Sequence, residues 1–415
     1  MRFRILPVLL AVFFLGLVTG TSLSAVAGSV TYARLQVFAD ALAIVESRYV
    51  DERDPDTLVY DAIGGLTQGL DDHSVFLDPD QYRDLREVTT GEYSGVGIDV
   101  FTRDGRIVVR QVFAGSPAQA AGLEEGDEIV GVNDRTLETT DPSLLLEDIR
   151  GLRGTVVVLR IERAGLEAAF DVSVRRAQIR TPSVEAELVM PQIALLRIDR
   201  FQRDTAEEVQ VALTRLRLDA TGDLDGVILD LRGNPGGYLS EAVEIADLWL
   251  GDGTIVSTVG RMGLADRDRA TLPGTDPDTP LVVLVDGSSA SASEVLAGAI
   301  QDRKRGRIVG STTYGKGSVQ QFFDLPDGSA LKLTTARYFT PNGQDIHGSG
   351  VAPDLALDSG DDEARSRTVK DFLAQRSGVP ESVTLDPALN LALAWFEDPQ
   401  GTDDWFVGAP LAPQQ

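Results

Sequence analysis

Residues 225–237 read DGVILDLRGNPGG, an apolar run that is followed at once by a Gly- and Pro-rich turn. Such a run is typical of a strand buried in a parallel sheet. The scheme recurs, with a run at 281–285 leading into a small-residue turn and a helix over 292–302, and with a third strand at 307–310 before another glycine-rich turn. Strand–turn–helix units predict a parallel sheet whose sites lie at the carboxyl ends of its strands. All three turns are expected at that edge.

The first of these turns spans Arg232 to Gly237. Glycines after a strand leave backbone N–H groups free to point outward, beside the positive end of the next helix. Such a turn can bind an anion or stabilise an oxyanion. By itself the pattern fits a tight turn without a ligand equally well.

The second turn, Ser288 to Glu294, places Ser291 at the start of a helix. Ser291 and Glu294 form the S-x-x-E pattern of a capping box, so a helix cap is one interpretation of this serine. A nucleophile at a helix start is the other. No G-x-S-x-G elbow is present, which argues against an α/β-hydrolase.

The third turn, Gly310 to Gly317, nearly matches a phosphate-binding P-loop. Gly317 stands where the magnesium-binding hydroxyl belongs, and residues 319–325 have the pattern of a strand rather than the helix that a P-loop requires. We therefore reject the P-loop. A lysine folded into a site can lose its proton by desolvation and act as a base, which makes Lys316 a candidate.

A serine nucleophile needs a base within hydrogen-bond reach. The chain has two histidines, His73 and His347, and neither lies near the turns in sequence. His73 follows two aspartates, where a capping or packing role is favoured over a metal or acid–base site. Lys316 is the economical base, and Gln320, four residues on, could orient its amine through the side-chain carbonyl.

The rest of the chain divides into regions that differ in composition and hydrophobic pattern. Residues 1–27 form a targeting segment, with Arg2 and Arg4 before an apolar run and a small-x-small cleavage site at 25–27. A cleaved signal peptide suits this short run, and an uncleaved anchor is the alternative. Residues 30–88 have helical periodicity, with a break at 71–74. Residues 89–176 show short strands near 107–109 and 156–158 and two short helices near 118–121 and 144–149, which indicates a compact domain.

The core is expected over residues 177–358 and includes an exposed loop at 261–280. Residues 359–415 are expected to form a C-terminal region with one helix at 387–395, followed by a polar tail. The charge balance is strongly acidic, with 38 basic against 64 acidic residues. A surface this negative repels nucleic acid, so no nucleic-acid partner is expected. The chain has no cysteine, which excludes disulfides, thiolate metal sites and cysteine nucleophiles. We expect no cofactor and no metal.

Taken together, these motifs resemble the carboxy-terminal processing peptidases, which are PDZ-containing serine proteases. Residues 289–294 are similar to the nucleophile motif of that family, and residues 314–317 to its lysine motif, at the family's spacing of 25 residues between serine and lysine. Residues 93–98, 114–118 and 126–127 resemble the PDZ signatures. His347 and Gly233 depart from the residues usual at their positions in the family.

The resemblance implies an α+β multidomain protein, with a PDZ domain inserted before a ClpP- and crotonase-like α/β core. It implies Ser291 as nucleophile, Lys316 as base and Gln320 as the group that orients the base. The oxyanion donors would be the N–H groups of Gly237 and Ala292. The remaining positions that it implies are Asp302, a weaker catalytic candidate better explained as a helix end, and the PDZ carboxylate-binding residues Val96, Gly97 and Ile98.

The predicted function is an exported, periplasmic or extracytoplasmic serine endopeptidase, either free or membrane-anchored, that binds the C-terminal tails of substrate proteins. A homo-oligomer and an activating partner protein are both compatible with the sequence. The alternative from another class is a non-catalytic PDZ adaptor. An acyl-CoA hydratase or hydrolase would also use a glycine turn, but it would need neither a PDZ domain nor an export signal.

Overall fold

The computed structural model describes residues 32–220, 222–271, 276–357 and 386–402. These residues belong to two compact units, one formed by the chain up to Pro79 together with Phe322–Leu333, and the other by the rest. Within the described ranges, no helix combines the length and the apolar character needed to cross a membrane.

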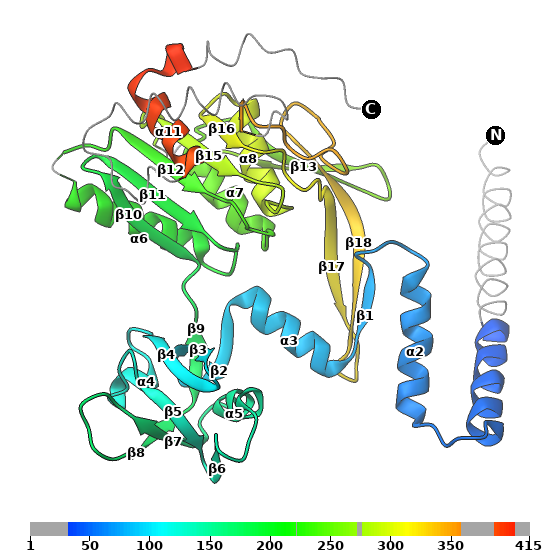
Figure 1. Ribbon diagram of the computed structural model, residues 1–415. Helices are drawn as coiled ribbons and strands as arrows, with labels where there is room; N and C mark the ends of the chain where they lie inside the picture. Colours follow the sequence, from blue (N-terminus) through cyan, green and yellow to red (C-terminus); the bar gives the residue numbers. More distant parts are fainter. Residues whose placement is uncertain (1–31, 221, 272–275, 358–385, 403–415) are drawn as a thin grey trace, which may run out of the picture. The chain divides into compact units, whose positions relative to one another are not determined.

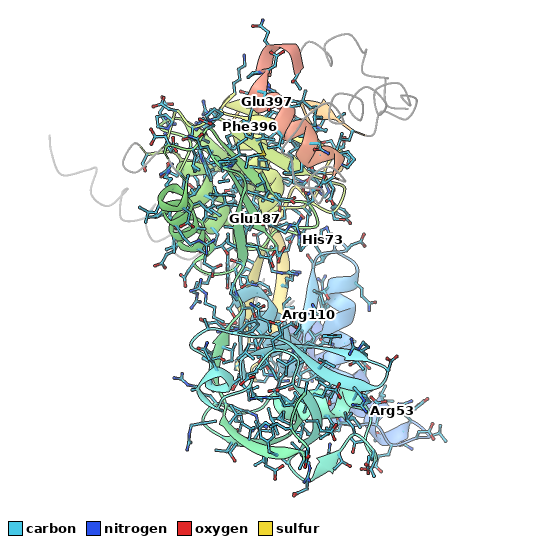
Figure 2. The ribbon with its side chains drawn as sticks, turned by 60° about the vertical axis from the view of Figure 1, so that its left-hand side comes forward. Arg53, His73, Arg110, Glu187, Phe396 and Glu397 are labelled. Atoms are coloured by element: carbon cyan, nitrogen blue, oxygen red, sulfur yellow. The ribbon has the colours of Figure 1, made fainter. Side chains whose placement is uncertain are left out.

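The first unit is largely helical, as the periodicity predicts. Residues 32–48 form one helix, and α2 (Pro55–Gln68) begins where Asp54 caps its first turn and Pro55 fixes the backbone. One element was not predicted: the short strand β1 (Val75–Leu77) pairs with residues 330–332 of strand β18 (Ala330–Phe339). The break at 71–74 is a turn in which the Asp71 carboxylate accepts hydrogen bonds from His73 and Ser74, and His73 is labelled in Figure 2.

The PDZ region forms a small β domain with two helices, as predicted. Its sheet has the order β3-β4-β5-β7-β8, and β6 pairs with β5. The apolar core of this region is built from alternating positions of these strands together with α4 and α5. The elements, entered from α3 (Pro79–Thr90), are β2 (Glu92–Gly95), β3 (Ile98–Arg103), β4 (Arg106–Val112), α4 (Pro117–Ala120), β5 (Glu128–Val132), β6 (Arg135–Thr136), α5 (Pro142–Ile149), β7 (Val156–Glu162), β8 (Phe170–Arg175) and β9 (Ala177–Arg180), which pairs with β2.

The core contains the predicted parallel sheet. Its strand order is β10-β11-β12-β15-β16-β19, parallel from β11 to β19, with β10 antiparallel at one edge. The strands are β10 (Val184–Met190), β11 (Ile193–Ile198), β12 (Gly226–Asp230), β15 (Leu281–Val285), β16 (Arg307–Gly310) and β19 (Leu355–Ala356). Every residue of β12 and β15 is buried, which explains why their sequences are apolar without alternation.

Helices cover both faces of this sheet (Figure 1). One face packs on α6 (Thr205–Asp219), α7 (Leu239–Asp247) and α8 (Ala292–Asp302), and Trp249 is fully buried among them. The opposite face, through residues such as Ile228 and Leu284, packs on α11 (Pro387–Glu397). The expected C-terminal helix is therefore part of the packed core.

A second sheet carries the strands β13 (Thr254–Gly260), β14 (Ala265–Arg269) and β17 (Ser318–Asp324) around β18. The exposed loop predicted over 261–280 is wrong in part, since β14 pairs antiparallel with β13. All five side chains of β14 are exposed. Backbone pairing at a sheet edge needs no apolar side chains, so the composition concealed this strand.

Candidate active site

Three turns that are far apart in sequence follow three neighbouring strands. Residues 232–237 follow β12, residues 286–291 follow β15, and residues 311–317 follow β16. Because these strands are adjacent and parallel, their turns leave the same edge of the sheet side by side. This confirms the placement predicted from the apolar runs.

Ser291 is the residue that immediately precedes α8. It is buried, and its backbone lies at φ 58° and ψ −113°, a region that non-glycine residues rarely adopt. The turn is held from the side of β12, since the Ser289 hydroxyl donates to the carbonyl of Leu231 at 2.8 Å and the Ala290 N–H donates to the carbonyl of Asn234 at 3.0 Å. Strain of this kind persists only where the surroundings enforce it, and it presents Ser291 at the helix start.

Glu294 connects the serine turn to the lysine turn. Its fully buried carboxylate accepts from the Ser291 N–H at 2.7 Å, so the capping contact predicted from S-x-x-E exists. The same carboxylate accepts from the hydroxyl of Thr313 and the N–H of Gly315, each at 2.6 Å, and from the N–H of Lys316 at 2.8 Å. The cap and the nucleophile are thus not alternatives. Contacts across 19 to 22 residues carry no local sequence signal.

Lys316 is half-buried in the third turn and lies between Gly315 and Gly317, two positions where the structure has no room for a larger residue or needs a positive φ. Gly315 has φ 89°, and a side chain on Gly317 would place its Cβ 2.5 Å from the backbone nitrogen of His347. Strand β17 follows, which bears out the rejection of the P-loop. Gln320, on β17, donates from its side-chain nitrogen to the hydroxyls of Ser318 at 2.9 Å and Thr334 at 3.3 Å. Because the nitrogen donates to these two hydroxyls, the carbonyl oxygen of Gln320 is the atom of this side chain that can accept a hydrogen bond from an amine.

The glycine turn lies directly against the serine turn. A Cβ at Gly236, where φ is 102°, would approach the carbonyl oxygen of Ala290 to 2.7 Å, the Cβ of Ser291 to 2.9 Å and the nitrogen of Ala292 to 3.1 Å. Gly237 forms a bridge to Phe201 in the extension of β11. The two proposed oxyanion donors, Gly237 and Ala292, therefore flank the place where these turns meet.

Tyr338 is a neighbour of Ser291 that sequence reasoning missed. Its phenol is buried beside the Ser291 side chain, and its N–H donates to the carbonyl of Gly317 at 2.8 Å. Burial raises the pKa of the Tyr338 phenol despite the opposing effect of the Ser291 hydroxyl. The phenol is therefore protonated near neutral pH and cannot serve as a base there. A single tyrosine on a distant strand gives no sequence pattern that would find it.

Asp302 and His347 differ in their position, since Asp302 lies at the far end of α8 from Ser291, whereas the backbone of His347 lies against Gly317 of the third turn. Asp302 is the last residue of α8 and accepts from the N–H of Asn342 at 2.8 Å, which is a helix-end role. His347 is exposed, and its N–H donates to the Asp345 carboxylate at 2.9 Å. The structure brings Ser291, the Lys316 turn and Gly237 together and leaves Asp302 at the far end of the helix.

The three residues predicted to bind a carboxylate lie where strand β2 ends and strand β3 begins. Val96 and Ile98 are buried, and Gly97 has φ 86° with its Cα against Ser116. The carbonyls of Val96 and Gly97 accept from Ala118 and Phe113, which fixes the loop between β2 and β3. These loop residues line a groove together with Leu146 and Ile149 of α5.

Comparison with known proteins agrees with this geometry. The family model described as peptidase family S41 matches residues 192–357, and the PDZ domain model matches residues 85–162. A carboxy-terminal-processing protease of Bartonella bacilliformis is 37% identical over 330 residues, which are 79% of this chain and 76% of that protein. A carboxyl-terminal-processing protease of Synechocystis is 39% identical over 306 residues, which are 72% and 71% of the two chains.

Among solved structures, a photosystem II D1 C-terminal processing protease is 31% identical. The match covers 77% of this chain and 92% of that one, with a TM-score of 0.45.

Proposed function

Because this chain belongs to the carboxy-terminal-processing proteases of peptidase family S41, a family of serine peptidases with a PDZ domain, we propose that it is an exported endopeptidase that uses Ser291 as nucleophile and Lys316 as base. The observation that supports this pair is the carboxylate of Glu294, which binds the backbone of both residues. A shared acceptor fixes the serine and lysine turns relative to each other, which a nucleophile and its base require.

The reaction begins when the neutral Lys316 amine removes the proton from the Ser291 hydroxyl, which attacks the scissile carbonyl carbon. The carbonyl oxygen takes on negative charge, which the N–H groups of Gly237 and Ala292 stabilise. The tetrahedral intermediate collapses as the amine of the substrate leaves with a proton from Lys316. Water, deprotonated by Lys316, then hydrolyses the acyl-enzyme and restores the serine. Gln320 orients the lysine through its carbonyl oxygen.

The substrates proposed are proteins with accessible C-terminal tails. A terminal carboxylate would bind the N–H groups of Val96, Gly97 and Ile98, and the extended tail would add as a strand to the PDZ sheet. Oligomerisation, a partner protein and membrane anchoring through residues 1–27 remain compatible with this activity.

The test is cleavage of an unfolded protein, β-casein, combined with labelling by a fluorophosphonate probe. Wild type should cleave casein and be labelled at Ser291, whereas Ser291→Ala should do neither and Lys316→Ala should lose about 10²–10⁴-fold in rate. Ser288→Ala is the matched control, because Ser288 lies in the same turn with an exposed side chain. Near-normal activity of Lys316→Ala would show that another group is the base.

Two further measurements address the remaining parts of the proposal. A peptide with a free C-terminus should bind the Ser291→Ala protein, and its amidated form should not. A reporter enzyme fused after residue 31 should become active only outside the cytoplasm. Cytoplasmic activity of that fusion would contradict export.

A further inference from the structure

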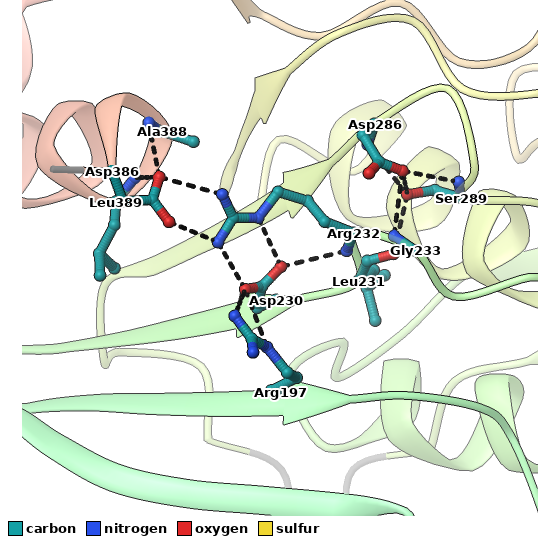
Figure 3. Close-up of polar contacts among 10 residues, drawn as sticks. All are labelled: Arg197, Asp230, Leu231, Arg232, Gly233, Asp286, Ser289, Asp386, Ala388 and Leu389. Carbon is teal, nitrogen blue, oxygen red and sulfur yellow. Dashed lines mark hydrogen bonds and ion pairs between the residues drawn. The ribbon is translucent and has the colours of Figure 1, made fainter. Parts of the chain in front are cut away.

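Four charged side chains meet at the end of β12 (Figure 3). Asp230 is fully buried, and its carboxylate accepts from Arg232 at 2.7 and 2.8 Å and from Arg197 at 3.1 Å. The other side of the Arg232 guanidinium reaches Asp386, with 3.0 Å from Nη1 to Oδ1 and 2.8 Å from Nη2 to Oδ2. Arg232 is therefore held between two carboxylates, one at the end of β12 and one from a residue 154 positions away.

Asp386 is also the N-cap of α11. One of its oxygens accepts from the N–H groups of Ala388 at 3.0 Å and Leu389 at 3.1 Å. The helix is fixed to the sheet at its other end too, because the ring of Phe396, labelled in Figure 2, lies over Gly226 at the start of β12, where a Cβ would approach it to 2.6 Å. Asp386 thus belongs to a firmly packed helix and not to a loose segment.

On its backbone side, Arg232 begins the glycine turn. The next N–H, that of Gly233, donates to the Asp286 carboxylate at 3.1 Å, and this carboxylate also accepts from the N–H groups of Ser288 at 2.9 Å and Ser289 at 3.0 Å. The start of the glycine turn is thus braced by α11 on one side and by the serine turn on the other, as Figure 3 shows.

We propose that Asp386 is a positioning residue for peptide-bond cleavage: by holding Arg232, it fixes the glycine turn that supplies the oxyanion donor Gly237. This inference rests on the proposed function, because it needs Gly237 to act as that donor.

The balance of charge in this cluster supports the assignment. Two arginines face two aspartates, and the exposed fractions of the side chains are 24% for Arg232, 25% for Asp386 and 0% for Asp230. Water screens such a pair less than it screens an exposed one, so its loss has more effect than the loss of a surface ion pair. The hydrogen bond to Asp230, reinforced by that to Asp386, raises the pKa of Arg232 above its ordinary value even though burial opposes this.

A role in positioning has a kinetic signature. The oxyanion exists only in the transition state, so misplacing its donor lowers kcat and leaves KM nearly unchanged. A residue that served only as a helix cap would lower the melting temperature without this split.

The experiment compares Asp386→Asn with wild type in peptide cleavage and thermal melting. Asparagine caps helices about as well as aspartate, so this variant removes the charge and keeps the cap. We expect kcat to fall about 5- to 50-fold, less than the roughly 10²–10³-fold loss on deleting an oxyanion donor. KM should change little, and the melting temperature should fall by only a few degrees at neutral pH, through loss of the ion pair with Arg232. Asp54→Asn is the matched control, because Asp54 caps α2 and is likewise followed by proline, and its kcat should equal that of wild type.

Each outcome decides between explanations. An unchanged kcat in Asp386→Asn, or a raised KM at constant kcat, would overturn the positioning role. If that variant unfolds, Asp386→Ser, which also keeps a capping oxygen, replaces it, and rates are normalised to the folded fraction measured by circular dichroism. If both variants largely unfold but their folded fraction has the wild-type kcat, the proposal is likewise overturned. Wild type that cleaves no peptide in a Ser291-dependent way would refute the proposed function itself, and is recognised before any Asp386 variant is compared.

Discussion

The backbone N–H groups of Ser291 and Lys316 donate to the same carboxylate oxygen, Oε2 of Glu294, at 2.7 and 2.8 Å. The proposed nucleophile and base are therefore both bound, through their backbones, to one buried atom, although they lie in separate turns. The link joins two backbone donors to one fully buried side-chain carboxylate, so it does not involve the side chains of Ser291 and Lys316.

Glu294→Gln should disable the enzyme without unfolding it. The amide nitrogen of glutamine cannot accept a hydrogen bond, so the N–H groups of Ser291 and Lys316, or that of Gly315, must lose their acceptor. We expect kcat to fall about 10²-fold, as a small misplacement of reacting groups does. Steady-state kinetics with circular dichroism tests this, and a variant with wild-type kcat would show that the link is dispensable.

Tyr338→Phe tests whether Tyr338, rather than Lys316, serves as the base for Ser291. Because its pKa is raised by burial, Tyr338 is a protonated neighbour and not the base. We expect the variant to keep kcat within about threefold, against the roughly 10²–10⁴-fold loss in Lys316→Ala. The comparison is made over pH 6–10 in one buffer series. A larger loss in Tyr338→Phe than in Lys316→Ala would reverse the assignment.

Gly236→Ala should abolish cleavage through sterics. Its Cβ would lie 2.7 Å from the carbonyl oxygen of Ala290 and 2.9 Å from the Cβ of Ser291, at a backbone φ of 102°. The turns must separate, which we expect to cost more than about 10²-fold in kcat. Gly233→Asn is the control, since nothing lies within 4 Å of a Cβ there and asparagine tolerates its φ of 73°. Equal activity of the two variants would contradict close contact between the turns.

Asp302→Asn should leave catalysis intact. Along α8 a rise of about 1.5 Å per residue puts Asp302 roughly 16 Å from Ser291. Its carboxylate accepts from the N–H of Asn342. We expect kcat within about twofold of wild type and a melting temperature lower by a few degrees. A loss of activity beyond about 10²-fold with a normal melting temperature would make Asp302 a participant after all.

The stability that Asp386 contributes should depend on pH only in acid. Burial acts to raise the pKa of Asp386, but its hydrogen bonds to Arg232 and the α11 backbone outweigh this and lower it. A carboxyl group with a lowered folded-state pKa stabilises the fold above its unfolded value, near 3.8, and loses that contribution as pH falls through the folded value. The difference in melting temperature between wild type and Asp386→Asn should therefore be constant above about pH 5 and shrink below about pH 4. A difference that already changes between pH 6 and 8 would point to another group.

The sequence predicted the parallel sheet and its three turns because buried strands such as 281–285 are apolar at every position, and because the lysine and serine motifs lie directly after them. It could not predict Tyr338, Asp386 or the far contacts of Glu294. Each of these depends on strand register or on packing between distant segments, which the order of residues does not display. The strand β14 was missed for the opposite reason, since its exposed side chains left no apolar pattern.

The position of Asp386 also bears on how the protein is made. The chain is synthesised from its N-terminus, so Ser291, Lys316 and the glycine turn emerge well before α11 does. If Asp386 completes the turn, a nascent chain contains the proposed nucleophile and base before it contains the residue that holds the glycine turn in place. Such a peptidase would have low activity during its own synthesis and would reach full activity only after α11 packs against the sheet.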